Sequence, residues 1–171
     1  LGKYEVQEIK APYGYVISKD IHSVELIYAG QNISVTETAT SFYNERQKAT
    51  LSMQKVLEKN DLFEIGNNGE IKNVVFGLYA AEELVSTSGT SIPADGLIEV
   101  ITFDENGLAT VKTDLPLGSY YVKEIATDEH YILNNTKYPV AFEYGGQDIA
   151  KVEIKVNNGE IIENDLIYGS V

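Results

Sequence analysis

The chain has 171 residues and a formal net charge of −13, which disfavours binding to nucleic acid or to an anionic membrane because both ligands are themselves negative. Zero cysteines exclude disulfides and thiolate-zinc sites, and two histidines, His22 and His130, make a histidine-based metal or catalytic centre improbable. We therefore predict no cofactor, no bound metal, no nucleic-acid partner and no membrane contact within these residues.

The composition indicates an all-β fold. Tyrosine is abundant (12), Met (1) and Trp (0) are scarce, and β-branched residues recur in short runs that Asn-Gly, Asp-Gly and Gly-Gly separate. In residues 1–48 we predict four strands, at 2–9, 15–17, 23–28 and 34–43. A four-stranded piece that begins without a partner strand resembles half of a β-sandwich.

The remaining residues predict a longer series of strands. These lie at 49–58, 73–80, 97–103, 108–113 and 118–126, with polar loops at 59–72 and 86–96. Asp104-Glu-Asn-Gly107 lies between two of them and predicts a hairpin turn.

An internal repeat relates the two parts of the chain. Tyr4-Glu-Val-Gln-Glu-Ile9 aligns with Tyr120-Tyr-Val-Lys-Glu-Ile125, at an offset of 116. The same offset pairs Tyr15 with Tyr131, Val24 with Val140, Tyr28 with Tyr144, Gly30 with Gly146, Gln31 with Gln147 and Ile33 with Ile149. Extra residues near Val156 then align Asn44 with Asn164. We predict the back half of one repeat unit at 1–48, a complete unit at 49–168 and the start of a third at 169–171.

Three strands of the complete unit each place a polar side chain on an apolar face. Strand alternation predicts these faces, because successive side chains point to opposite sides. Lys55 lies among Leu51, Met53 and Leu57, Glu124 lies beside Tyr120 and Val122, and Asn164 lies between Ile162 and Leu166. Burying a charge is costly unless it is paired or neutralised, so this arrangement needs an explanation.

These three residue types suggest a specific reaction. A desolvated lysine loses its proton more readily and becomes an amine nucleophile. A carboxyl in the same pocket has a raised pKa, so it can stay protonated, bond to the asparagine carbonyl and shuttle protons. Attack of the Lys55 amine on the Asn164 carboxamide would expel ammonia and leave an amide cross-link. A buried hydrogen-bonded cluster without a bond, or a different side-chain register, remains open as an alternative.

Several motifs carry a family resemblance. Gly118-Ser-Tyr-Tyr-Val-Lys-Glu-Ile, Gly2-Lys-Tyr-Glu-Val-Gln-Glu-Ile, Val75-Phe-Gly-Leu-Tyr79 and Asp104-Glu-Asn-Gly-Leu-Ala-Thr resemble the Cna B-type (SpaA-like, prealbumin-like) repeats of Gram-positive surface adhesins and pilins. The resemblance implies an immunoglobulin-like or prealbumin-like β-sandwich. It also implies an isopeptide bond between a first-strand lysine and a last-strand asparagine, promoted by a glutamate. By position these residues are Lys55, Asn164 and Glu124.

The first unit departs from this pattern. It has the matching Glu8 and Asn44, but nothing upstream provides a lysine, so it should form no bond. Glu8 is therefore an internal control for Glu124. Either the missing strands of this unit lie outside this sequence or they arrive on another chain. The unpaired edges of the unit could then recruit a second molecule by strand exchange through residues 1–48, or could pack differently from the parent fold.

The resemblance implies a stalk or spacer function at the cell-wall-attached surface of a Gram-positive bacterium, with targeting and anchoring signals outside these residues. The expected partners are neighbouring repeats of the same protein. The alternative is an adhesin module that recognises a host matrix protein. An enzyme with turnover is the least favoured class, since no second cluster of acid, base and nucleophile is visible.

Overall fold

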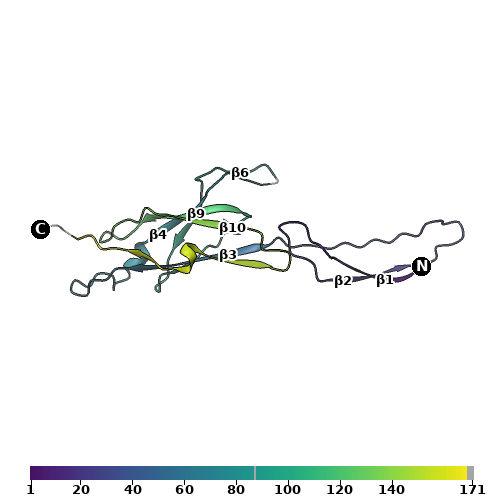
Figure 1. Cartoon of the computed structure of the whole chain (residues 1–171), viewed down its shortest axis with the longest axis horizontal. Helices are drawn as coiled ribbons and strands as arrows, with labels where there is room; N and C mark the ends of the chain where they lie inside the picture. The colour runs from purple at the N-terminus through teal and green to yellow at the C-terminus, as the bar shows by residue number, and fades with distance from the viewer. Residues whose placement is uncertain (87, 169–171) are drawn as a thin grey trace. The chain divides into compact units, whose positions relative to one another are not determined.

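The computed structural model describes residues 1–86 and 88–168, and within them the chain is all-β with two short 3-10 turns and no α-helix (Figure 1). In the same residues, no helix has the length and hydropathy that a membrane span requires. The predicted start of a third repeat at 169–171 lies outside the described residues.

The chain forms two compact units. Unit 1 consists of Leu1–Gln47 and Tyr144–Lys151, and unit 2 of Lys48–Glu143 and the chain from Val152 onward. The loop Tyr144–Lys151 thus lies with the first 47 residues, although the sequence repeat assigns it to the second copy. The repeat boundaries that we drew from the sequence stay a prediction.

Unit 2 is a β-sandwich of two four-stranded sheets. The first sheet has the order β10-β9-β4-β7, and the second has the order β11-β3-β12 with β8 also paired to β3. The strands are β3 (Lys48–Leu57), β4 (Val75–Ala80), β7 (Leu97–Thr102), β8 (Leu108–Thr110), β9 (Gly118–Ala126), β10 (Lys137–Phe142), β11 (Lys151–Lys155) and β12 (Ile162–Asn164). Two short strands, β5 (Leu84–Val85) and β6 (Ser91–Ile92), form a separate ribbon, and the 3-10 turns are η1 (Glu70–Asn73) and η2 (Val156–Gly159).

Buried side chains from both sheets form one core. Leu51 and Met53 of β3 pack in the same cluster as Phe76 of β4, Val122 of β9 and Phe142 of β10. These residues alternate with more exposed ones along their strands, as the period of two requires. The prediction of an all-β sandwich is therefore confirmed.

The internal repeat is visible in the strand pairing. In unit 1, β1 (Gly2–Gln7) pairs antiparallel with β2 (Ile21–Leu26), and Gly2 faces Leu26. In unit 2, β9 pairs antiparallel with β10, and Gly118 faces Phe142. Both strands of the second pair follow the first at the offset of 116 that the sequence showed. The two segments thus share one register as well as one pattern.

Two predicted strands of the first unit are absent from the described residues. Residues 34–43 form no strand, and Tyr15 takes part only in an isolated bridge with Arg46. Residues 35–39 align with β11 and residues 42–44 with β12, and both of those strands lie beside β3. No strand equivalent to β3 is present for unit 1 in the described chain, so these segments have no ladder to join.

The predicted hairpin at Asp104–Gly107 is a corner instead. Gly107 N–H donates to Asp104 O at 3.0 Å, so the turn itself forms. The flanking strands, however, pair with different sheets: β7 pairs with β4, and β8 pairs with β3. The turn therefore carries the chain from one sheet of the sandwich to the other.

Gln47 holds the loop Tyr144–Lys151 within unit 1. Its side chain is buried, its Nε2 donates to Gly146 O at 3.0 Å and to Ile149 O at 2.6 Å, and its Oε1 accepts from Gly145 N at 2.8 Å. One side chain thus satisfies three backbone groups of a loop that is about a hundred residues away in sequence.

We expect Gln47→Ala to release this loop. Each lost hydrogen bond is worth about 0.5–1.5 kcal/mol, so amide exchange at Gly145 should accelerate by roughly tenfold or more. Hydrogen exchange measured by NMR tests this, with Gln7→Ala as the control because Gln7 is an exposed glutamine of β1. Unchanged exchange at Gly145 in Gln47→Ala would contradict the role of Gln47.

Candidate functional site

The three polar residues on apolar faces lie in the core of unit 2. Lys55, Glu124 and Asn164 are 2%, 1% and 2% exposed. β12 runs parallel to β3, and the Cα partner of Lys55 is Ile162, two residues before Asn164. Glu124 belongs to β9 in the other sheet, so its carboxyl enters the core from the opposite layer. Side-chain burial thus follows the faces that alternation predicted.

Lys55 donates hydrogen bonds to two backbone carbonyls. Its Nζ donates to Val56 O at 3.1 Å and to Ile162 O at 3.2 Å. Burial lowers the pKa of Lys55 to about 8, although the negative charge of Glu124 acts in the opposite direction. A substantial fraction of this amine is therefore neutral near physiological pH, which is the form that has a free lone pair.

Glu124 is shifted the other way. Burial raises its pKa, and this outweighs the opposing effects of the Asn134 N–H, the Asn164 amide and the Lys55 charge. The Asn134 N–H donates to Oε2 at 2.6 Å. A carboxyl with a raised pKa exchanges a proton more readily at neutral pH, so Glu124 is suited to proton transfer.

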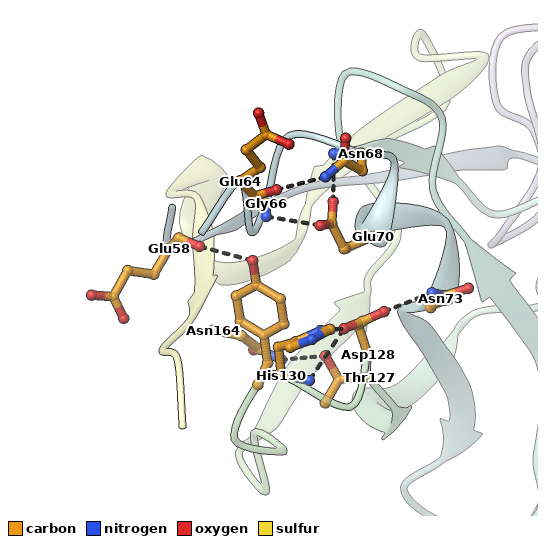
Figure 2. A network of polar contacts seen from close by, with 11 residues as sticks. Glu58, Glu64, Gly66, Asn68, Glu70, Asn73, Thr127, Asp128, His130 and Asn164 are labelled. Carbon is orange, nitrogen blue, oxygen red and sulfur yellow. Dashed lines mark hydrogen bonds and ion pairs between the residues drawn. The ribbon is translucent and has the colours of Figure 1, made fainter. Parts of the chain in front are cut away.

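Asn164 joins the carboxyl to a neighbouring hydroxyl. Its Nδ2 donates to Glu124 Oε1 at 2.8 Å and Oε2 at 3.0 Å, and to Thr127 Oγ1 at 3.0 Å, and Figure 2 shows Asn164 beside Thr127. Its Oδ1 is buried and has no hydrogen-bond partner among the described residues. An unpartnered buried acceptor costs about 1–3 kcal/mol, so this amide is in an unfavourable ground state.

The orientation of the amide differs from the expected one. We expected Glu124 to bond to the asparagine carbonyl, whereas the structure turns the nitrogen of Asn164 toward Glu124. An ionised carboxylate only accepts hydrogen bonds, so it selects the amide nitrogen. A protonated Glu124 would instead donate to Oδ1 after the amide rotates, which would also satisfy the unpartnered oxygen.

Sequence reasoning missed the contribution of the loop after β9. From the sequence we assigned no role to residues 126–131, yet Thr127 of this loop accepts a hydrogen bond from Asn164. The offset of 116 places Ala11 opposite Thr127, so the gain of a hydroxyl at this position was a usable signal.

The same loop is anchored by an ion pair (Figure 2). His130 Nδ1 lies 2.6 Å from Asp128 Oδ1, and Asn73 Nδ2 donates to Asp128 Oδ2 at 2.7 Å. The hydrogen bond to Asp128 raises the pKa of His130. The His130 ring therefore helps to hold the segment that carries Thr127.

Unit 1 repeats part of this geometry. Asn44 Nδ2 donates to Glu8 Oε2 at 2.6 Å, and the Ser18 N–H donates to the same oxygen at 2.6 Å. Ser18 aligns with Asn134 at the offset of 116, so the backbone contact to the glutamate is the same in both units. No lysine contacts this pair within the described residues, and both side chains are only half-buried.

Gly107 supports the backbone of Lys55. It has a φ of +72°, its carbonyl accepts from Lys55 N at 2.7 Å, and a Cβ at this position would lie 1.9 Å from Lys55 O. No side chain therefore fits here without moving β3 at the lysine.

We expect Gly107→Ala to destabilise unit 2 more than Gly69→Ala does. Gly69 also has a positive φ, +86°, but a Cβ there would meet nothing within 4 Å. Both variants bear about 1–2 kcal/mol for the left-handed conformation, and Gly107→Ala bears about 1–3 kcal/mol more for the clash. Chemical unfolding of the two variants measures the difference, and equal stabilities would show that Gly107 does not constrain β3.

Comparison with known protein families finds one match. The SpaA prealbumin-like fold domain matches residues 57–164, which is more than half of the chain and includes Glu124 and Asn164. No curated protein matches the chain by sequence.

Several solved structures resemble this chain in part. The Bacillus anthracis TIE protein has a TM-score of 0.57 at 23% identity, over 97% of this chain and 25% of its own. The group B streptococcus pilus 2b backbone protein has a TM-score of 0.43 at 16% identity, over 77% of this chain and 47% of its own. The Corynebacterium diphtheriae major pilin SpaA has a TM-score of 0.40 at 15% identity, over 69% of this chain and 30% of its own.

The chain thus spans between a quarter and a half of the length of these proteins. At 23% identity the likeness to the TIE protein shows the fold alone. The match of the family model over residues 57–164 is the stronger finding, and by it the chain belongs to the SpaA family of prealbumin-like fold domains.

Proposed function

We propose that this chain is a structural spacer of a bacterial cell-surface protein, and that unit 2 is stabilised by an isopeptide bond between Lys55 and Asn164. The observation that carries the proposal is the burial of Lys55, Glu124 and Asn164 together, with the Asn164 amide hydrogen-bonded to Glu124. The lowered pKa of Lys55 and the raised pKa of Glu124 support it. Membership of the SpaA family agrees with a structural role.

The reaction needs only these three side chains. The neutral Lys55 Nζ attacks Cγ of Asn164, and Glu124 takes a proton from Nζ as the new C–N bond forms. Glu124 then gives a proton to Nδ2, the C–Nδ2 bond breaks, and ammonia leaves. One amine and one primary amide thus become one secondary amide and one ammonia, and Glu124 returns to its starting state. Folding supplies the proximity that the reaction requires, so it occurs once and without turnover.

The product would strengthen the sandwich. By analogy with the loop-entropy model of disulfides, closing a loop on the order of 100 residues contributes about 4.7 kcal/mol to the free energy of unfolding. An amide is also unaffected by reducing agents, which suits a chain with no cysteine. The spacer would lie at the surface of a Gram-positive cell between neighbouring repeats of the same protein. Recognition of a host matrix protein and strand exchange through residues 1–48 stay predictions.

Intact mass spectrometry of the folded chain tests the bond. We expect the chain to lack the mass of one ammonia, and Lys55→Met, Asn164→Ala and Glu124→Gln each to retain the full mass. Lys55→Met keeps the aliphatic volume of the buried side chain, so it separates loss of the amine from loss of packing. The full mass in folded wild-type protein would refute the cross-link.

Unit 1 provides a control within the same molecule. Because no lysine contacts Glu8 and Asn44 in the described chain, we expect the loss of one ammonia and not of two. Peptide mapping should place the cross-link between Lys55 and Asn164, and Glu8→Ala should leave the mass unchanged relative to wild type apart from the substitution itself. A cross-link that involves Asn44 would overturn this assignment.

The rate of bond formation should depend on pH through Lys55. Its pKa of about 8 means that protonation inactivates the nucleophile below this pH. We expect the rate to rise roughly tenfold per pH unit well below pH 8 and to level off above it. Chain purified in denaturant can be refolded at a series of pH values, quenched with acid and analysed by intact mass. A pH-independent rate would show that deprotonation of Lys55 is not limiting.

A further inference from the structure

A short turn occurs twice in the chain and is not used by the proposed cross-link. Its copies are Tyr28-Ala-Gly-Gln-Asn-Ile33 and Tyr144-Gly-Gly-Gln-Asp-Ile149. Both have the same backbone: Ile33 N donates to Gly30 O at 3.2 Å, and Ile149 N donates to Gly146 O at 3.3 Å. Gly30 and Gly146 have φ of +113° and +100°, a region that other residues rarely adopt. The two copies therefore present the same shape.

The second copy is seated on residues 9–17 within unit 1. Gln147 Oε1 accepts from Ala11 N at 2.9 Å, and Gln147 Nε2 donates to Ile9 O at 3.3 Å. The backbone oxygen of Gln147 also accepts from Ile17 N at 2.9 Å. The glutamine of the turn thus bonds to three backbone groups of one segment.

Tyrosine contacts and Gln47 complete this seat. Tyr144 donates its hydroxyl to Tyr15 O at 2.7 Å, and its ring meets Tyr13 edge-on at a centroid distance of 4.8 Å. Gln47 reaches the turn from the other side through its three hydrogen bonds. We call residues 9–17 together with Gln47 the unit end.

In the part of the chain that the structure describes, no segment is hydrogen-bonded to the side chains of the first copy of the turn. Tyr28 and Ile33 are 66% and 52% exposed, and Gln31 is exposed as well. In the seated copy, by contrast, Tyr144 and Gln147 are half-buried. No residue of the described chain bonds to the Gln31 side chain, so the groups that hold the second copy in place are available in the first.

We propose that the turn Tyr28–Ile33 is a docking surface for the unit end of another repeat of this kind, one that has a glutamine at the position of Gln47. The chemistry of the seated copy identifies the occupant. It must offer a backbone N–H and a carbonyl to the Gln31 side chain and a carbonyl to the Tyr28 hydroxyl. It must also have a glutamine whose side chain bonds to the backbone of the turn. The turn carries no charged residue, so the net charge of −13 does not oppose the contact locally. The proposal concerns a surface of unit 1 and does not require the Lys55–Asn164 bond.

Unit 2 of a second copy offers nearly such an end. Tyr131 N donates to Asp128 O at 3.0 Å, as Tyr15 N does to Pro12 O at 3.1 Å. Ile167 N donates to His130 O at 2.8 Å, as Gln47 N does to Gly14 O at 2.8 Å. Ile167 thus takes the place of Gln47 and lacks the amide.

Sedimentation equilibrium of the chain with Ile167→Gln tests the proposal. Ile167 is 56% exposed, so this change leaves the core intact. We expect Ile167→Gln to associate at least about tenfold more tightly than wild type, because the amide regains hydrogen bonds to the turn. The contact is heterologous, so association should continue beyond a dimer. Salt of about 0.15 M screens repulsion between the acidic copies.

Two double variants make the test specific. Ile167→Gln with Gln31→Ala should return to the wild-type association, whereas Ile167→Gln with Gln7→Ala should associate as Ile167→Gln alone, because Gln7 is an exposed glutamine outside the turn. No gain from Ile167→Gln, or a gain that Gln31→Ala leaves intact, would overturn the proposal. The intact mass of the same samples reports the cross-link separately, so the two proposals fail independently.

Discussion

Removal of water from Lys55 and Glu124 is the constraint on which the site depends. Burial lowers the pKa of the amine and raises that of the carboxyl, so each is driven toward its neutral form. Burying two ionisable groups destabilises the folded state, and apolar residues of similar volume would not carry this penalty. The proposed amide would remove the cost of burying the lysine charge, because the product has no ionisable lysine. The same desolvation that destabilises the unreacted site therefore favours the neutral, nucleophilic form of Lys55, and its raised pKa makes the Glu124 carboxylate a better proton acceptor.

Unit 1 shows the back half of the repeat without a lysine strand among the described residues. The β1–β2 pair keeps the register of β9–β10, and Asn44 still bonds to Glu8. However, residues 34–43 form no strand, and the glutamate and asparagine are only half-buried. The hydrogen bond between a glutamate and an asparagine is thus local to the back half of the repeat. Glu124 and Asn164 are fully buried in unit 2, whose second sheet contains β3.

Much of this architecture could be predicted from period-two faces and one sequence offset. Alternation along a strand depends only on that strand, and the offset compares the sequence with itself. Neither therefore requires knowing which strands pair. The errors concern pairing itself. Residues 34–43 have strand-like residues but no neighbour, and Asp104–Gly107 has hairpin-like residues but connects two sheets. The role of Gln47 could not be predicted either, because its partners are about a hundred residues away and are backbone groups that any sequence would supply.

The proposed bond would reinforce the pairing of the short last strand, β12, with β3. β12 pairs with β3 in parallel at only three positions, from Lys55–Ile162 to Leu57–Asn164. Tension applied at the start of β3 and beyond the end of β12 would act on this short ladder in shear, and each of its hydrogen bonds is individually weak. A covalent link from Lys55 to Asn164 lies across the same ladder. Force would then pass from β3 directly to the end of β12, and residues 56–163, which include the rest of the sandwich, would bear little of it.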